Sequence, residues 1–321
     1  MIYSNFNFHP IGQGCFYTGN IAIKNNRHGA FNFVYDCGTN SKRIFLDNET
    51  TNYKNILEHT TIDLLVISHF DSDHVNGVVD LLKGIRCKRL VIPYYSPSER
   101  LVLYAVDSSR DDEYLVLLRD PIAFFSDGEK FRIDEIVVVG GGEDTRPAER
   151  GELPPFNPDY IRNMSEQEML ELESIEGEND SSFEQVVLNN EHRGSTYSRT
   201  IFVRVPVTMK ILGKLWEFVF YLREFADKNK IAAFQQAVDT LLTGNSIFTL
   251  FDKKLRSAVQ GLYKQYFKAV NFTSLCLYHG PLFKMGKEYD YWESYSFWHR
   301  GCIFWSILTP PFRSKLTPPF R

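Results

Sequence analysis

Residues 64–77 read Leu64-Leu65-Val66-Ile67-Ser68-His69-Phe70-Asp71-Ser72-Asp73-His74-Val75-Asn76-Gly77, an apolar run followed by four side chains that can bind metal. The run at 64–67 is typical of a strand that is buried on both faces. Residues 75–83 have the apolar spacing of a helix that Gly84 ends, and residues 89–93 predict another buried strand. This order predicts a βαβ unit, in which ligands usually bind at the carboxyl ends of the strands.

The loop after the first of these strands contains His69, Asp71, Asp73 and His74 within six residues. Imidazole nitrogens and carboxylate oxygens are ligands that zinc, manganese and iron use in hydrolase sites. In an extended loop, His69, Asp71 and Asp73 point to one side, and His74 faces the neighbouring side, where it could serve a second ion. The alternative is a turn in which Ser72 or Asp73 caps the next helix and the histidines are merely exposed. The metal site is preferred, because capping does not explain two histidines that flank two aspartates.

Composition limits the class of protein. A chain of 321 residues with 43% apolar and 24% charged side chains is globular and forms one large domain or two smaller ones. A net charge of −4 provides no overall field for a polyanion, so nucleic-acid binding needs a local basic patch. Five scattered cysteines without a CxxC pair indicate reduced thiols and a cytoplasmic location, and they exclude a zinc ribbon. Neither a signal peptide nor a membrane-spanning run is expected.

The rest of the chain predicts further strands and helices and two unusual segments. The acidic, proline-containing segment 143–191 is interpreted as a solvated surface excursion, with a lid over the site or a contact for a protein partner as alternatives. Residues 306–321, SILTPPFR-SKLTPPFR, are a near-duplication too short for a repeat fold and predict an unpacked tail. Strands are predicted at 6–8, 15–17, 21–24, 31–35, 135–139, 200–205 and 215–223, and helices at 98–118, 165–178, 228–242 and 248–270.

The pattern H-x-D-x-D-H-x-x-G at 69–77 resembles the metal-binding signature of the metallo-β-lactamase fold, in the variant of ComEC-like hydrolase domains, where aspartate replaces the second histidine. Residues 8–15, FHPIGQGC, resemble the VGQGD-type strand and turn of that family, and residues 34–38, VYDCG, resemble its D-x-G strand end. Residues 271–277, NFTSLCL, are similar to its N-x-x-S-L strand. The resemblance implies an α/β fold, an αβ/βα four-layer sandwich, as a single domain over residues 1–321. A polar and acidic insertion at about 95–195 interrupts that domain.

The resemblance also implies a metal-dependent hydrolase, in which a metal-bound water or hydroxide attacks an ester, an amide or a phosphodiester. His69, Asp71, Asp73 and His74 would then bind metal, Asp73 would also act catalytically as proton acceptor, and Asp36 would orient the ligand loop. One or two Zn²⁺ ions are the first choice, and the extra carboxylate makes Mn²⁺ or Mg²⁺ credible. A phosphodiester or a nucleic acid is the expected substrate.

Two departures from the family pattern leave a second function open. Cys15 stands where the family commonly has aspartate, and the family's downstream T-G-D aspartate and H-H-G-S histidine have no counterpart. The fold is therefore expected to be incomplete at its carboxy-terminal metal-ligand motifs. His279 is a candidate substitute ligand, against the simpler interpretation of an ordinary loop histidine. The alternative function is a catalytically defective or truncated protein that acts as a binding or regulatory module.

Overall fold

Two β-sheets and a layer of helices make up the part of the chain that the computed structural model describes, residues 2–23, 30–57, 60–106, 112–142, 173–176, 180–191, 200–212, 215–222, 228–242, 246–267 and 274–282. The larger sheet contains, in spatial order, β1 (Ile2–Phe8), β2 (Gly14–Ile23), β3 (Phe31–Thr39), β4 (Thr61–Val66), β5 (Arg86–Pro93), β6 (Arg132–Gly140) and β8 (Thr200–Arg204). The smaller sheet contains β11 (Cys276–Pro281), β10 (Trp216–Tyr221), β9 (Val207–Ile211) and β7 (Glu173–Glu176).

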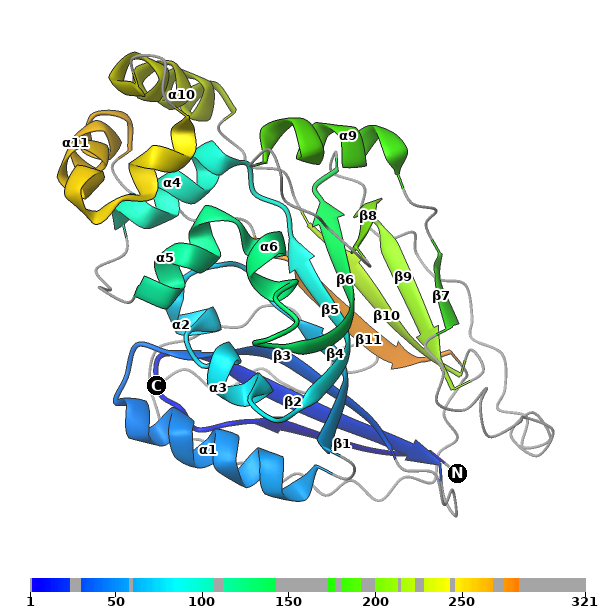
Figure 1. Ribbon diagram of the computed structural model, residues 1–321. Helices are drawn as coiled ribbons and strands as arrows, with labels where there is room; N and C mark the ends of the chain where they lie inside the picture. The colour runs from blue at the N-terminus through cyan, green and yellow to red at the C-terminus, as the bar shows by residue number, and fades with distance from the viewer. Residues whose placement is uncertain are drawn as a thin grey trace, which may run out of the picture.

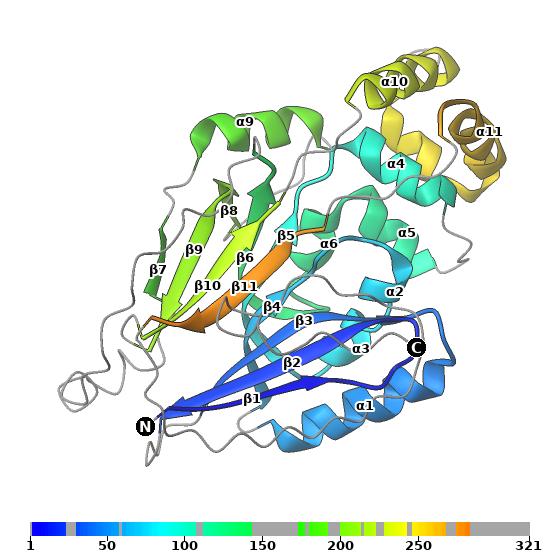
Figure 2. The same cartoon turned by 180° about the vertical axis from the view of Figure 1, so that it is seen from behind.

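Helices cover one face of the larger sheet, and the smaller sheet packs on its other face (Figure 1 and Figure 2). The predicted α/β class is confirmed. Of the four layers expected, the described residues show three: one layer of helices and the two sheets. The helical elements are α1 (Arg43–Ile56), α2 (Ser72–Val75), α3 (Val78–Leu82), α4 (Pro97–Val106), α5 (Asp112–Arg119), α6 (Pro121–Phe125), α9 (Ser181–Asn190), α10 (Lys228–Leu242), η2 (Ile247–Phe251), η3 (Lys253–Leu255) and α11 (Arg256–Tyr266).

Strand direction gathers the loops of the larger sheet at one edge. β1, β2 and β3 pair antiparallel, whereas β3, β4, β5, β6 and β8 are parallel neighbours. The carboxyl ends of the parallel strands therefore lie at the same edge, where open α/β sheets bind ligands. The loop with the four predicted metal ligands begins at the carboxyl end of β4, so the sheet places it at this edge.

Alternating side chains of the central strands fill two separate cores. Val34 on β3 and Leu65 on β4 face the helices, whereas Phe33 and Val66 face the smaller sheet. Both strands are apolar on both faces, as parallel strands covered on two sides require. This double burial explains why residues 64–67 form a continuous apolar run.

Several element boundaries differ from the predictions. The two strands predicted at 15–17 and 21–24 form one strand, β2. Gly19, between them, makes room for the ring of Phe33, which a Cβ at Gly19 would meet at 2.0 Å. The predicted helix 75–83 is interrupted at Gly77, whose N–H donates to the Cys37 carbonyl and separates α2 from α3. The helix predicted at 98–118 is two helices, α4 and α5, and the one predicted at 248–270 is three shorter elements, η2, η3 and α11. Helix α10 matches its prediction. Neither α1 nor β9 was predicted.

Parts of two predicted segments lie outside the described residues. The predicted helix 165–178 is wrong at its end, because Glu173–Glu176 form the strand β7, and its remaining residues are not among those described. The tail 306–321 and most of segment 143–191 also lie outside them. No helix in the described ranges combines the length and apolarity that a membrane crossing requires.

Candidate metal centre

The loop that follows β4 is held in place from several sides. The Ser68 N–H donates to Oδ1 of Asp36 at 2.7 Å, and the Ser68 carbonyl accepts from the N–H of Leu275 at 2.7 Å. Farther along the loop, the Tyr114 hydroxyl donates to the Phe70 carbonyl at 2.8 Å. Strand β3, helix α5 and the residue just before β11 thus fix the backbone that carries the predicted ligands.

Three of the four predicted metal ligands of this loop, His69, Asp71 and His74, lie together. Nδ1 of His69 is 3.2 Å from Oδ2 of Asp71, and the ring centroids of His69 and His74 are 3.8 Å apart. Asp73 precedes His74 in the first turn of α2 and lies close enough to raise the pKa of His74. The side chains of His69 and His74 are 12% and 14% exposed, so solvent reaches them at the edge of a buried loop.

Asp36 lies directly beneath this group and contacts it. Its carboxylate is fully buried, and Oδ2 accepts from the Ser68 hydroxyl at 2.6 Å and from Nδ1 of His74 at 2.7 Å. This contact fixes the ring of His74 and makes Nε2 the nitrogen that the imidazole presents to a metal, as expected of a carboxylate that orients a ligand. Asp36 adopts a positive φ of 60°, a conformation that aspartate and asparagine tolerate better than other non-glycine residues.

The electrostatics of the loop suit a cation. Burial alone would lower the pKa of His74, but the charges of Asp36, Asp73 and Asp71 outweigh it and raise that pKa above its ordinary value. For Asp71, burial acts to raise the pKa, and the hydrogen bond and charge of His69 outweigh it and lower the pKa. With neutral imidazoles, three carboxylates leave the site strongly negative. Oxygen and nitrogen donors with excess negative charge fit a divalent metal ion.

Cys15, which departs from the family pattern in sequence, is a further candidate ligand. Ligand atoms of Cys15, Asp36 and His74 lie within 4.8 Å of one another, and Cys15 is 3% exposed. The signal was its position directly after Gly14, in the turn that resembles a family motif. A thiolate is a soft ligand, so its participation would favour Zn²⁺ over Mn²⁺ or Mg²⁺.

Two glycines let the ligand loop approach the larger sheet. A Cβ on Gly38 would lie 2.6 Å from the backbone carbon of Asp73 and 2.7 Å from that of His74, and a Cβ on Gly14 would lie 2.6 Å from the Asp73 carbonyl oxygen. Backbone atoms cannot give way as a flexible side chain can. The absence of these two side chains therefore sets the position of Asp73 and His74.

Replacing Gly38 by alanine should displace α2, cost about 1–3 kcal/mol of unfolding free energy and lower the metal content of the protein. Urea unfolding and elemental analysis of the purified variant measure the two effects. Gly128→Ala is the matched control, because no atom lies within 4 Å of its added Cβ. Normal stability and metal content in Gly38→Ala would contradict the importance of this close approach.

His279 lies on β11 between the two sheets, in an aromatic environment rather than beside the ligand loop. It pairs with Phe218 across β10 and β11, and its Nε2 lies 3.1 Å from the Tyr17 hydroxyl. Rings within 6.2 Å of its own belong to Phe6, Tyr17, Phe33, Trp216 and Phe218. The structure does not bring His279 into the cluster formed by Cys15, Asp36 and His74.

Acid should destabilise the protein through His279. Burial lowers the pKa of His279 from 6.5 to about 4, so the unfolded chain takes up a proton first as the pH falls. The stability that neutral His279 contributes is complete above pH 6.5 and is lost as the pH falls toward 4, about 2 kcal/mol of it by pH 5. His279→Phe should remove that part of the pH dependence, measured by urea unfolding at pH 7.5 and pH 5. Identical pH dependence in the two proteins would refute this role.

Comparison with known proteins places these observations in a class. Residues 23–156 match the family model described as the Metallo-beta-lactamase superfamily. The matched region contains β3 to β6 and the whole ligand loop, and the seven-stranded mixed sheet with its helices is consistent with the metallo-β-lactamase fold. A comparison with curated proteins found no match. The match and the two sheets thus indicate a metallo-β-lactamase fold over residues 23–156, and the loop at the carboxyl end of β4 is its candidate metal site.

Proposed function

We propose that the protein is a metal-dependent hydrolase of the ComEC-like type that cleaves phosphodiester bonds. The observation that carries this proposal is the loop after β4, which gathers His69, Asp71 and His74 above the buried carboxylate of Asp36. The match to the metallo-β-lactamase superfamily covers the same residues and supports a hydrolase. The aspartate at position 71 of the H-x-D-x-D-H pattern supports the ComEC-like subgroup.

Each side chain of the loop has a separate task in this proposal. His69 and Asp71 hold one side of the metal position, and Asp73 and His74 hold the other, with Nδ1 of His74 fixed by Asp36. When bound, Zn²⁺, or alternatively Mn²⁺ or Mg²⁺, supplies Lewis-acid activation of water and of the scissile bond. Asp73 accepts the proton that the attacking water loses. Cys15 is close enough to add a thiolate to the ligand set.

The variants His69→Ala and Asp73→Ala test the proposal. Both should lose the bound metal, measured by elemental analysis, and the hydrolysis of bis(p-nitrophenyl) phosphate, because each removes a ligand of the same centre. Asp134→Ala is the control, because Asp134 forms an exposed ion pair with Arg86 away from the loop. Unchanged metal content in both ligand variants would refute the assignment.

A binding or regulatory module without catalysis is the second candidate function. One observation favours it. Among the described residues, the ligand atoms that lie together come from positions 15–74. The downstream candidate, His279, instead lies in the aromatic environment between the sheets. Wild-type protein that holds metal but hydrolyses no phosphodiester would support this candidate and contradict the hydrolase.

A further inference from the structure

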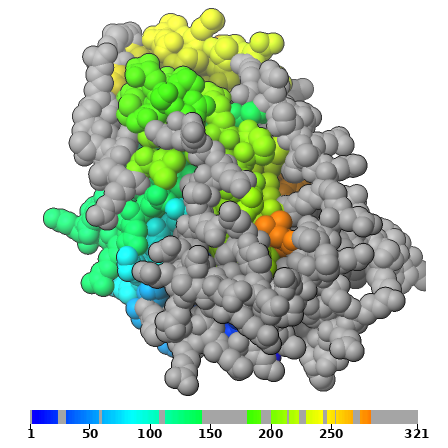
Figure 3. Space-filling model, turned by 90° about the vertical axis from the view of Figure 1, so that its right-hand side faces the viewer, coloured from blue at the N-terminus to red at the C-terminus, as the bar shows by residue number. Residues whose placement is uncertain are grey.

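A cavity of about 640 Å³ opens at the same edge of the larger sheet as the metal loop. Its floor contains Gly140 and Arg204, at the carboxyl ends of β6 and β8, and α9 and α10 form two of its walls. Figure 3 shows α9, in green, at the surface next to the yellow segment of the helical region. This volume lies within the range of cavities that hold one small molecule or one unit of a larger one.

Tyr95 connects the cavity with the metal loop. It lines the cavity, and its ring packs edge-to-face on the ring of Phe70, with centroids 5.7 Å apart. Phe70 stands between His69 and Asp71 in the loop. Neighbouring strands lie about 4.8 Å apart, so Gly140, two strands from β4, is roughly 10 Å from the loop. The cavity and the ligand loop are therefore neighbours, separated by the packed rings of Tyr95 and Phe70.

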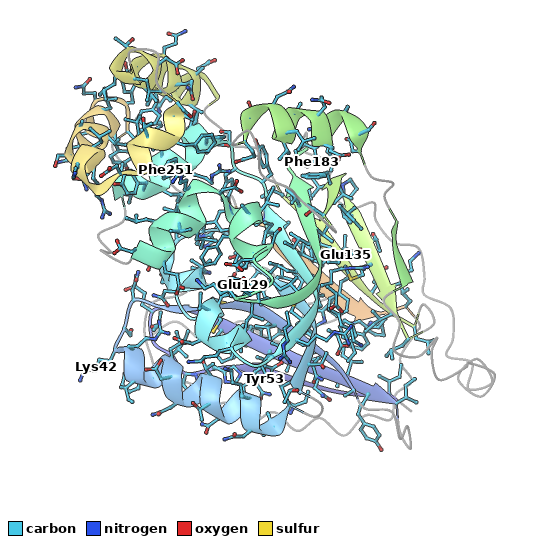
Figure 4. The ribbon with its side chains drawn as sticks, in the orientation of Figure 1. Lys42, Tyr53, Glu129, Glu135, Phe183 and Phe251 are labelled. Carbon is cyan, nitrogen blue, oxygen red and sulfur yellow. The ribbon has the colours of Figure 1, made fainter. Side chains whose placement is uncertain are left out.

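The lining presents flat surfaces and amide groups. Tyr94 meets Phe183 edge-to-face at 5.6 Å, and Phe183 lies on the side of α9 that faces the sheet (Figure 4). The Arg204 guanidinium lies 4.8 Å over the Phe183 ring, and Asn190 adds an amide from the end of α9. Phe183 is itself buried and supports the guanidinium, so the exposed plane of Arg204 is the surface on which an unpaired base can stack, and the Asn190 amide can hydrogen-bond the edge of that base.

A buried ion pair fixes the distance between two walls of the cavity. Arg100 on α4 donates to both carboxylate oxygens of Glu191, just after α9, at 2.7 Å each, and to the Tyr95 carbonyl at 2.7 Å. These bonds join the chain after β5 to the end of α9. The cavity is thus preformed, which reduces the ordering cost of binding a ligand.

We propose that this cavity is the specificity pocket of the hydrolase and holds a planar heteroaromatic group, a nucleobase in a nucleotide substrate, next to the phosphodiester at the metal loop. The inference rests on the proposed function for its catalytic part. Arg204 and Asn190 are the specificity-determining residues, and Phe183 positions the guanidinium of Arg204. A larger side chain at Ala232 on α10 would fill the pocket.

Two esters with the same leaving group test the pocket. Thymidine 5′-(p-nitrophenyl phosphate) carries a base, and methyl p-nitrophenyl phosphate does not. Ala232→Trp and Arg204→Ala should lower kcat/KM for the thymidine ester by roughly 5- to 150-fold, the worth of stacking one base, and leave the methyl ester unchanged. Gln236→Trp on the same helix and Arg86→Ala are the matched controls, because neither residue lines the cavity.

A binding measurement separates the pocket from the chemistry. Calorimetry with thymidine 5′-monophosphate and chelator-treated protein should show binding to wild type and Gln236→Trp and weaker binding to Ala232→Trp. If wild type hydrolyses neither ester, the proposed function fails, while this binding measurement still decides on the pocket. If the nucleotide does not bind, or binds equally to Ala232→Trp and Gln236→Trp, the pocket is refuted even in an active hydrolase.

Discussion

Asp36→Asn should weaken metal binding by roughly 10- to 100-fold, the usual cost of removing a group that orients a ligand. In the native protein, one carboxylate oxygen accepts from both the Ser68 hydroxyl and His74 Nδ1, and the other accepts from the Ser68 N–H. An asparagine amide must direct its NH₂ group at one of these donors, so His74 loses its fixed orientation. Asparagine tolerates the positive φ of this position, so the backbone is not strained. Competition with a chromophoric chelator measures the affinity.

Asp63→Asn provides a matched control for this prediction. Asp63 is also a buried carboxylate, 4% exposed, and it accepts from the Asn32 N–H and from Lys88. It lies near the start of β4, at the opposite end of the strand from the ligand loop. This variant should lose stability but keep its metal affinity. Wild-type metal affinity in Asp36→Asn would show that Asp36 does not orient the site.

Arg100→Ala should destabilise the protein by about 3–5 kcal/mol, because it leaves a buried carboxylate without its partner. Arg100 and Glu191 are 1% and 4% exposed, and their two hydrogen bonds are bidentate. Solvent cannot replace the guanidinium at this depth. The free energy of unfolding, measured by urea titration at pH 7, reports the loss.

The double variant Arg100→Met with Glu191→Leu distinguishes a lost partner from lost packing. Replacing both charges by apolar groups of similar volume should recover much of the stability, because no unpaired charge remains. Metal content should stay near that of wild type, since neither residue belongs to the ligand loop. A single variant that loses less than about 1 kcal/mol would contradict the buried-pair account.

The sequence predicted those parts of the fold in which local pattern and environment agree. The apolar run at 64–67 and the polar loop after it gave both β4 and the position of the ligand loop, because a strand buried on both faces has a distinctive composition. Helix α10 was predicted with its boundaries, because its apolar residues keep helical spacing throughout.

Where the sequence analysis failed, a tertiary contact overrides the local signal. Residues 15–17 and 21–24 were predicted as separate strands, but they form one strand, in which Gly19 accommodates Phe33 from the neighbouring strand. Gly77 lies within a helical pattern, but its bond to Cys37 separates α2 from α3. Cys15 could not be singled out, because its approach to Asp36 and His74 depends on the pairing of β2 with β3.

The residues of the ligand loop lie within the first quarter of the chain. Two hydrogen bonds around the loop, however, involve Leu275, about 200 positions later. The Leu275 N–H donates to the Ser68 carbonyl, and the Leu275 carbonyl accepts from the Tyr35 hydroxyl, across 240 residues. Contacts of such large sequence separation form late, because closing the intervening chain costs entropy. On a ribosome, the ligand residues emerge long before Leu275. The ligand loop therefore reaches its final geometry only when the segment before β11 docks, late in folding.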